Sequence, residues 1–412
     1  MAGVTQLEGN AVTDSTGPTQ TPTLAARLAR LGMVLGFVVI LQAGLVAAFV
    51  TASRDPVPHQ LPVAVVGTPQ ATAALQSRLS RAGAFALRQE PTEAAAEDAI
   101  RHLEVYGALR PASHPATLLV ASAASPLVAQ VLTKAFTAAV QQSGSQLAVK
   151  DVAPLPADDP RGAVGPYLVL GLLIGGYVGA MVIGRLIGMR SPSVRHLGLR
   201  LAVLACYAAV AGAAGVILLG PALGVLHGNV LAIFATGSLV AFAVGCFTSA
   251  LQSLLGLVGT LLSVITLVLI GNPAAGGGQI PPAMMSPAWG WLAHVLPNPA
   301  GMTAVRGIEF FGGNGTSEAF AVLSVYAAAG IVVMLVLALV PAGRRGQASS
   351  QRADLATDLA AETGSGAMLL RTGLPVRAAP PADRQCRSLG FSSHHETATV
   401  RVLKIIERSI IF

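Results

Sequence analysis

Six long apolar stretches divide this chain and constrain its fold more than any other feature. A helix that crosses the hydrocarbon core of a bilayer needs about twenty apolar residues and satisfies its backbone hydrogen bonds internally. We therefore predict an α-helical polytopic membrane protein with six transmembrane helices, the fourth and fifth joined by a tight turn near Thr248–Ser253. The predicted spans are Leu31–Val50, Gly165–Gly184, Leu201–Gly220, Asn229–Ser249, Leu251–Gly271 and Ala319–Val340.

Composition favours a membrane protein and argues against nucleic-acid binding. Charged residues make up only 11% of the chain, against about 25% in soluble proteins. The formal net charge is +7, but the arginines flank the apolar stretches, as residues that set membrane orientation do. Aromatic residues make up 5% of the chain, which leaves few side chains on which bases could stack. We expect no nucleic-acid partner.

The arginines near the span ends predict the orientation of the chain, because positive residues in short loops favour the cytoplasmic side. With six spans, three arginine clusters fall on one side of the membrane. On the other side, the link between the third and fourth spans carries His227, and the link between the fifth and sixth carries a single arginine, Arg306. The segment between the first two spans is not counted, because the rule weakens for long loops. We expect a multi-pass protein of the cell membrane with both termini in the cytoplasm. The clusters are Arg27 and Arg30, then Arg185, Arg190, Arg195 and Arg200, then Arg344 and Arg345.

The first apolar stretch has two interpretations. It could be the core of a cleaved signal peptide, or it could remain as a membrane anchor. Its apolar run is longer than a usual signal core, and a polar leader of about thirty residues precedes it. We favour the uncleaved anchor.

Residues 52–163 have a different character, because short apolar runs that end in turn signals alternate with segments of helical spacing. This alternation predicts a small α/β domain. Thr92 precedes a predicted helix whose first turns are acidic, as at many helix N-termini. The predicted strands are 61–67, 85–91, 105–111, 116–125 and 146–155, and the predicted helices are 71–83, 92–105 and 125–144.

Together these patterns predict five parts. An extracytoplasmic α/β domain is inserted between transmembrane helices 1 and 2, and the last part is mostly disordered because it lacks helical periodicity over most of its length. The parts are a cytoplasmic N-terminal segment (1–30), transmembrane helix 1 (31–51), the α/β domain (52–163), a transmembrane domain with helices 2–6 and an outer loop at 272–318 (164–341), and a cytoplasmic tail (342–412).

The predicted spans contain no Asp, Glu, Lys, Arg or His. Ionisable residues inside a membrane usually mark proton or ion pathways, so their absence argues against a gradient-driven pump. An ion site built only from carbonyl groups is the alternative that this argument does not exclude. A P-loop needs a lysine after Gly and before Ser or Thr, and Lys134, Lys150 and Lys404 all lack that context. We therefore favour a transporter that uses ATP hydrolysed by another subunit.

The glycine triplet Gly276–Gly278 follows a predicted span and lacks a lysine, so we do not interpret it as a phosphate-binding loop. The outer loop that contains it carries Trp289 and Trp291, which we predict to anchor a short helix in the membrane interface. Met302–Phe311 is predicted as a second interfacial helix. We recognise no catalytic motif, metal-ligand spacing or cofactor motif, and we expect a protein that is not an enzyme.

Small residues recur at four-residue spacing in the second span. Gly171, Gly175 and Gly179 form one row, and Gly184 belongs to an adjacent row. Such rows let helix backbones approach closely in lipid. They predict either packing within one subunit or the interface of a dimer.

The stretch Gly271–Gly313 and the strings LPVAVVG, VYGALRP and TLLVASAASPLVAQVLTKAF resemble the ABC-2 type transporter permeases. The closest likeness is to actinobacterial members similar to the phage-infection-protein-like membrane proteins, and it covers roughly residues 25–345. The resemblance implies a permease without its own ATPase, which works as a homo- or heterodimer with a separate ABC ATPase subunit. It names no substrate.

The resemblance also implies that the cytoplasmic link after the second span contacts the ATPase. The candidate coupling residues are Arg185, Arg190, Arg195, His196 and Arg200. The alternative for these residues is membrane orientation and contact with lipid headgroups.

We therefore expect the permease subunit of an ABC-type exporter. One rival is a membrane-anchored receptor or scaffold whose α/β domain binds envelope or phage components without transport, and another is an ion-gradient transporter.

Overall fold

The computed structural model describes residues 24–54, 56–67, 73, 83–111, 115–141, 144 and 146–340. The predicted helix at 71–83 lies almost wholly outside the described residues, and so does the predicted tail at 342–412.

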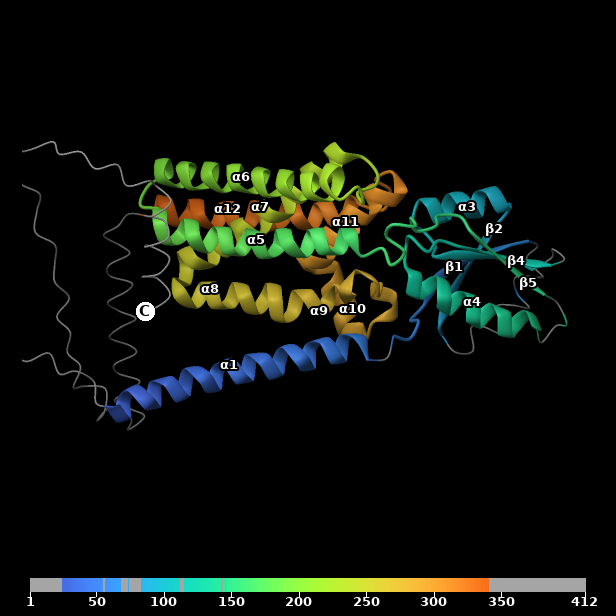
Figure 1. Ribbon diagram of the computed structural model, residues 1–412, viewed down its shortest axis with the longest axis horizontal. Coiled ribbons are helices and arrows are strands. Elements are labelled where there is room, and N and C mark those ends of the chain that lie inside the picture. The colour runs from blue at the N-terminus through green and yellow to red at the C-terminus, as the bar shows by residue number, and fades with distance from the viewer. Residues whose placement is uncertain are drawn as a thin grey trace, which may run out of the picture. The chain divides into compact units, whose positions relative to one another are not determined.

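The structure confirms six helices that are long and apolar enough to cross a membrane. Most of them lie side by side in one bundle (Figure 1). The helices are α1 (Leu24–Ser53), α5 (Val164–Ile187), α6 (Val194–Ile217, extended by a π-helical turn Leu218–Ala222), α7 (Val230–Leu255), α8 (Leu257–Val264, continued by π-helical Ile265–Gly271 and by α9, Asn272–Ala274) and α12 (Ser317–Leu339).

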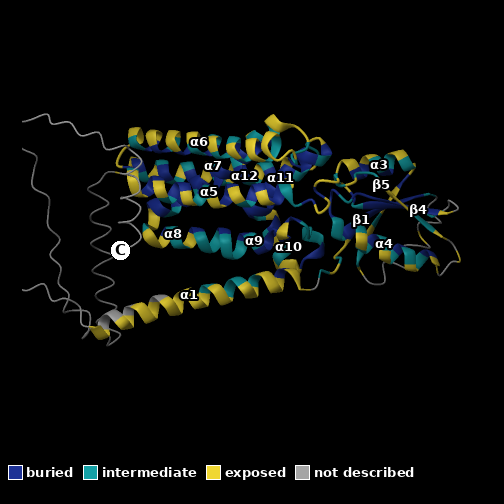
Figure 2. Cartoon of the chain, in the orientation of Figure 1, coloured by how far each residue is buried: buried dark blue, intermediate teal, exposed yellow. Residues whose placement is uncertain are grey.

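Large apolar side chains lie exposed along α1 and on one side of α6, whereas buried residues concentrate in α5, α7 and the further helix α11 (Pro297–Phe311) (Figure 2). Met33 and Ile40 of α1, for example, are 75% and 70% exposed. An apolar surface of this extent is costly in water and favourable in hydrocarbon. The distribution of exposed side chains therefore fits a multi-pass membrane protein.

Helix α7 lies at the centre of the bundle and packs against α5, α6, α11 and α12. A Cβ atom added at Gly176 of α5 would lie 2.7 Å from the carbonyl oxygen of Ala241 in α7. A Cβ atom added at Gly330 of α12 would lie 2.7 Å from the backbone of Cys246, also in α7. Glycine is therefore required at both contacts. In lipid the hydrophobic effect contributes little to helix association, so close packing at small residues stabilises the bundle instead.

The predicted turn near Thr248–Ser253 is wrong, because α7 continues to Leu255 and the chain turns at Gly256. Gly256 has φ 62°, a left-handed conformation that glycine adopts readily. Polar residues near the predicted turn find partners within the bundle. Ser253 Oγ, for example, donates to the carbonyl oxygen of Ser249 at 2.7 Å.

The predicted spans contain no ionisable residue. The helices in the structure extend beyond these spans and include ionisable residues near their ends. Arg185 lies in the last turn of α5 and Glu318 in the first turn of α12. Helix α6 begins before the predicted span and includes Arg195, His196 and Arg200. Charged groups thus gather near the two ends of the bundle, where a helix leaves the hydrocarbon.

Arg200 is fully buried at the end of the bundle that carries the α5–α6 link (residues 188–193), which we call the link-side end. Its Nη1 donates to the carbonyl oxygen of Met189 at 2.7 Å, and its Nη2 donates to Gln252 Oε1 at 3.1 Å. Ser253 Oγ accepts a longer bond from Nη1 at 3.3 Å. One side chain of α6 therefore joins the link to the end of α7.

The α/β domain lies between α1 and α5 in the sequence. Its sheet has the strand order β2-β1-β3-β4-β5, with all neighbours parallel except the antiparallel pair β3 and β4. The predicted strands and two of the predicted helices are confirmed. They are β1 (Leu61–Val66), β2 (Phe85–Glu90), β3 (Gly107–Arg110), β4 (Ala116–Val120), β5 (Leu147–Asp151), α3 (Glu93–Arg101) and α4 (Pro126–Gln141).

The two helices cover opposite faces of this sheet, because successive strand residues point to opposite sides. Ala64 of β1 packs in the cluster with Ile100 of α3, whereas the adjacent Val63 packs with Phe136 of α4. Thr92 caps α3 as predicted, since its side chain accepts a hydrogen bond from the N–H of Ala95 at 3.1 Å.

We predict that Arg200→Met destabilises the protein by about 2 kcal/mol, because the buried Gln252 Oε1 loses its donor and the carbonyl oxygen of Met189 keeps only its bond from Ser253 Oγ. The melting temperature of the purified protein in mild detergent measures this effect. The matched control is Arg195→Met, since Arg195 is exposed on the same helix. Equal melting temperatures for the two variants would contradict a structural role for Arg200.

Candidate functional site

The α/β domain contacts the predicted outer loop, called the outer loop below, at what we call the domain-side end of the bundle. Met284, in a short 3-10 turn (Pro282–Met284), is fully buried and belongs to the same apolar cluster as Val128 and Phe136 of α4. The N–H of His59 donates to the carbonyl oxygen of Ala283 at 2.7 Å. The outer loop therefore supplies part of the core of the α/β domain.

The predicted interfacial helix Met302–Phe311 is wrong in both length and position. It belongs to α11, which runs from Pro297 to Phe311 and is buried against α5, α7 and α12. A Cβ atom at Gly301 would lie 2.9 Å from the side chain of Val169 in α5. This close approach places α11 inside the bundle rather than on its surface.

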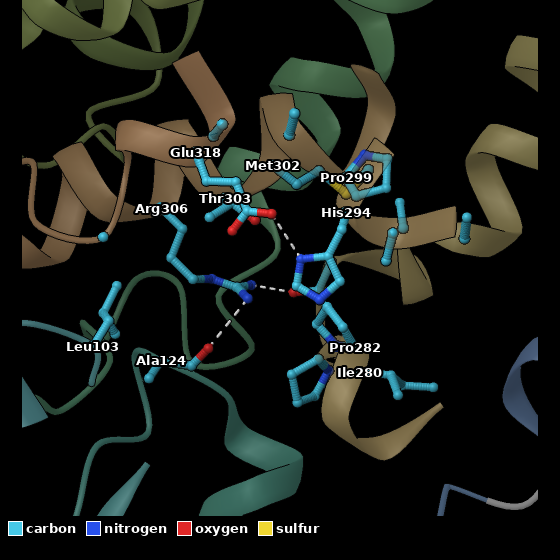
Figure 3. Close-up of a pocket in the computed structure, with 18 of the residues that line it drawn as sticks. Leu103, Ala124, Ile280, Pro282, His294, Pro299, Met302, Thr303, Arg306 and Glu318 are labelled. Atoms are coloured by element: carbon cyan, nitrogen blue, oxygen red, sulfur yellow. Dashed lines mark hydrogen bonds and ion pairs between the residues drawn. The ribbon is translucent and has the colours of Figure 1, made fainter. Parts of the chain in front are cut away.

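A cavity of about 310 Å³ lies where the α/β domain, the outer loop and the starts of α11 and α12 meet (Figure 3). This volume is at the lower end of the range of small-molecule sites, roughly 300–1,000 Å³. Its lining is mostly apolar, with polar groups from Tyr106, His294, Thr303, Arg306 and Glu318. We take this cavity as the candidate functional site.

Arg306 projects from α11 into the cavity and connects two segments that are far apart in the sequence (Figure 3). Its Nη1 donates to the carbonyl oxygen of Ala124 in the α/β domain at 3.3 Å, and its Nη2 donates to the carbonyl oxygen of Gly278 in the outer loop. Nearby, Ser125 Oγ donates to the carbonyl oxygen of Gln279 at 2.8 Å. Arg306 and Ser125 thus hold the α/β domain against the loop.

The charge of Arg306 is not neutralised by an ion pair with any residue that the structure describes. Burial lowers the pKa of its guanidinium, while Tyr106, Glu309 and Asp159 raise it. Burial likewise raises the pKa of the Tyr106 hydroxyl. Because arginine stays protonated at any ordinary pH, the cavity contains a permanent positive charge.

His294 and Glu318 line another part of the cavity, and His294 Nδ1 lies 2.9 Å from Glu318 Oε1. Both side chains are exposed. Trp291 lies one turn before His294 on α10 (Pro287–Val295) and is 63% exposed, whereas Trp289 is partly buried. That either tryptophan anchors in a membrane interface stays a prediction.

Glu309 lies one helical turn beyond Arg306 and is 6% exposed. Neither carboxylate oxygen has a hydrogen-bond partner of good geometry among the described residues. Burial raises the pKa of Glu309 to about 7, with contributions in the same direction from Asp159 and Asp158, while the backbone of His227 and the charge of Arg306 lower it. Asp159 itself accepts hydrogen bonds from two N–H groups at the start of α5. Glu309 is therefore protonated more readily than an ordinary glutamate.

The predicted coupling residues lie together at the link-side end, but they differ in exposure. Arg185, Arg190 and Arg195 are exposed, and Arg190 Nε also donates to the carbonyl oxygen of Ser253 at 3.2 Å. His196 is partly buried, with Nε2 3.1 Å from the carbonyl oxygen of Ile187. Arg200 is fully buried, so it is not available for direct contact with a partner.

The glycines of the two predicted packing rows face different surroundings. A Cβ atom at Gly179 would clash with the ring of Tyr207 in α6, and the hydroxyl of Tyr207 donates to the carbonyl oxygen of Gly175 at 2.8 Å. A Cβ atom at Gly184 would lie 2.6 Å from Gln252 Oε1. Gly171 is exposed, with open space in front of it. Three of the four thus pack within the subunit, and only Gly171 faces outward.

Within the part of the chain that the structure describes, no group of three or more His, Cys, Asp or Glu side chains is arranged to hold a metal ion. The free cysteines in that part, Cys206 and Cys246, lie within α6 and α7.

The sequence interpretation missed Arg306, Glu309 and Met284 as the residues around which the domain-side end is organised. A signal was present, because Arg306 and Glu309 are three residues apart in an otherwise apolar stretch. That spacing places two charged residues on one helix face.

These observations define a mostly helical chain with six apolar helices that are able to span a membrane and a small α/β sheet domain. Comparisons with protein-family models, with curated proteins and with solved structures gave no match.

We predict that Glu309→Gln stabilises the protein at pH 8 and has little effect near pH 4.5. The pKa of about 7 lies above the ordinary value of 4.5, so the folded state binds more protons between these values and loses stability as the pH rises through them. The expected gain at pH 8 is about 1–3 kcal/mol. Melting temperatures measured across this pH range test it.

The control for this prediction is Asp98→Asn, an exposed substitution on α3 that removes the same charge. A difference between wild type and Glu309→Gln that does not vary with pH would show that Glu309 does not titrate as described.

Proposed function

We propose that this chain is the permease subunit of an ABC-type exporter in the cell membrane, with both termini in the cytoplasm and the α/β domain outside. In this proposal ATP is hydrolysed by a separate ABC ATPase subunit, and the permease acts as a homo- or heterodimer. Six apolar helices, the resemblance of Gly271–Gly313 to ABC-2 type permeases and the lack of a P-loop lysine in the sequence support it.

The observation that carries the proposal is the construction of the link-side end. Exposed arginines on and beside the link, such as Arg185 and Arg195, offer positive charge to a partner. Arg190 in the link bonds to Ser253, and the buried Arg200 of α6 bonds to Gln252 and Ser253, at the end of α7. A partner that displaces the link therefore also displaces α7.

Helix α11 connects α7 to the domain-side end, because it packs against α7 and also lines the cavity. Helix α7 packs against α11. The contact is close, because a Cβ atom added at Gly301 of α11 would lie 3.1 Å from the side chain of Val240 in α7. Arg306, just over one turn further along α11, lines the cavity and binds the α/β domain. Movement of α7 against α11 would thus change the cavity.

The alternative is a receptor or scaffold whose α/β domain binds envelope or phage components without transport. The location of the cavity favours it, since the cavity lies between the α/β domain and the end of the bundle rather than across the spans. In that case the link-side arginines would serve membrane orientation and headgroup contact.

Co-purification distinguishes the two functions. We predict that the tagged chain, extracted in mild detergent, carries an ABC ATPase with it, and that Arg185→Glu combined with Arg195→Glu lowers the amount recovered at least several-fold. The repulsion between the new carboxylates and an acidic partner surface is the reason. Quantitative mass spectrometry of the eluted complex measures the recovery.

Arg161→Glu is the matched control, because Arg161 is exposed just before α5 begins, at the opposite end from Arg185. Export by the purified chain alone in vesicles, or the absence of any ATPase from the eluate, would contradict the proposal. Transport lost on collapse of an ion gradient with ATP intact would favour the gradient-driven rival.

A further inference from the structure

We propose that the cavity around Arg306 binds an anionic amphiphile with a single hydrocarbon chain, the anionic head against the Arg306 guanidinium and the start of the chain against the apolar walls. This inference concerns binding only, and it does not depend on whether the protein exports anything.

The first argument is the unneutralised charge. Arg306 donates to two backbone carbonyl groups, which orient the guanidinium but do not cancel its charge. A guanidinium has more N–H donors than these two bonds use. An anionic head placed in the cavity would accept charge-assisted hydrogen bonds from the remaining donors, and such bonds are stronger than bonds between neutral groups.

The acidic groups nearby do not remove this preference. Glu309 lies on the same helix, is buried and has a raised pKa, so it carries less negative charge than an ordinary glutamate. Asp159 directs both of its oxygens at the N–H groups that begin α5. Glu318 is exposed and lies 2.9 Å from His294. Arg306 therefore remains the dominant charge that faces the cavity.

The second argument is the apolar lining. Most of the wall comes from apolar residues of the outer loop, α11 and α12, among them Ile280, Pro282, Ala300, Met302 and Val322. Such walls favour a hydrocarbon chain over a hydrated ion. Sites for small molecules commonly combine a mostly apolar wall with a few polar groups that fix the orientation of the ligand.

The third argument is location and size. Ala319 and Val322 line the cavity from the first turns of α12, which is one of the six apolar helices. The cavity therefore adjoins the level at which the bundle becomes apolar, where amphiphiles concentrate. Its volume of about 310 Å³ suits one chain and a small head rather than a two-chain lipid.

The test is equilibrium binding to the full-length protein in phosphatidylcholine nanodiscs, with empty nanodiscs to subtract partitioning. The probes are palmitate, lysophosphatidylglycerol and uncharged monopalmitoylglycerol. We expect saturable binding of at least one anionic probe, and binding of the uncharged probe that is at least about tenfold weaker. Palmitate and lysophosphatidylglycerol distinguish a carboxylate from a phosphate head.

Two variants assign the binding to this cavity. Thr303→Trp fills the cavity from an exposed position on α11 and should abolish saturable binding, whereas Thr303→Ala leaves the cavity open and should not. Arg306→Gln should weaken the anionic probe about tenfold or more without weakening the uncharged one. Because Arg306 also holds the α/β domain, the Thr303 pair decides the question if Arg306→Gln does not fold.

Equal affinity for charged and uncharged probes would overturn the proposal, and so would unchanged binding in Thr303→Trp. Saturable binding of inorganic phosphate or of an acidic peptide with the same affinity as palmitate would also overturn it, because the hydrocarbon chain would then contribute nothing. No ATPase is present in this assay, so its failure leaves the export proposal standing, and loss of the ATPase partner leaves this one standing.

Discussion

Both ends of the bundle depend on the same interaction, an arginine of the bundle that donates to backbone carbonyl groups of irregular segments. Arg200 binds the carbonyl of Met189 at the link-side end, and Arg306 binds the carbonyls of Ala124 and Gly278 at the domain-side end. A carbonyl group that leaves water without a donor costs free energy, and apolar neighbours cannot supply one. Arginine meets this need because it has several donors and a long apolar stem.

Between these two ends the bundle is held by close contact of small residues. Glycines such as Gly176 and Gly330 let α5 and α12 approach the central α7. Helix α7 packs against both α6, which carries Arg200, and α11, which carries Arg306. The proposed export function uses the link-side end of this arrangement, and the proposed amphiphile site uses the domain-side end.

The sequence predicted what depends on local pattern and missed what depends on tertiary contact. Apolar length gave the number of spanning helices, and alternating short runs gave the strands of the α/β domain, since both are local properties. The turn at Gly256 was misplaced because one long apolar run was divided by length alone, whereas the bonds that Gln252 and Ser253 form with Arg200 join residues far apart in the sequence. The burial of α11 and the insertion of Met284 into the α/β core were missed for the same reason.

Single-cysteine labelling of intact cells tests the central claim, which is that the α/β domain and its cavity face outward while the arginine-rich link faces the cytoplasm. Asp98→Cys on α3 and Pro192→Cys in the link, both at exposed positions, would be made in a chain whose own Cys206, Cys246 and Cys386 are replaced by Ala. A membrane-impermeant maleimide should label position 98 in intact cells and position 192 only after the membrane is opened. Labelling of position 192 but not 98 in intact cells would contradict the account.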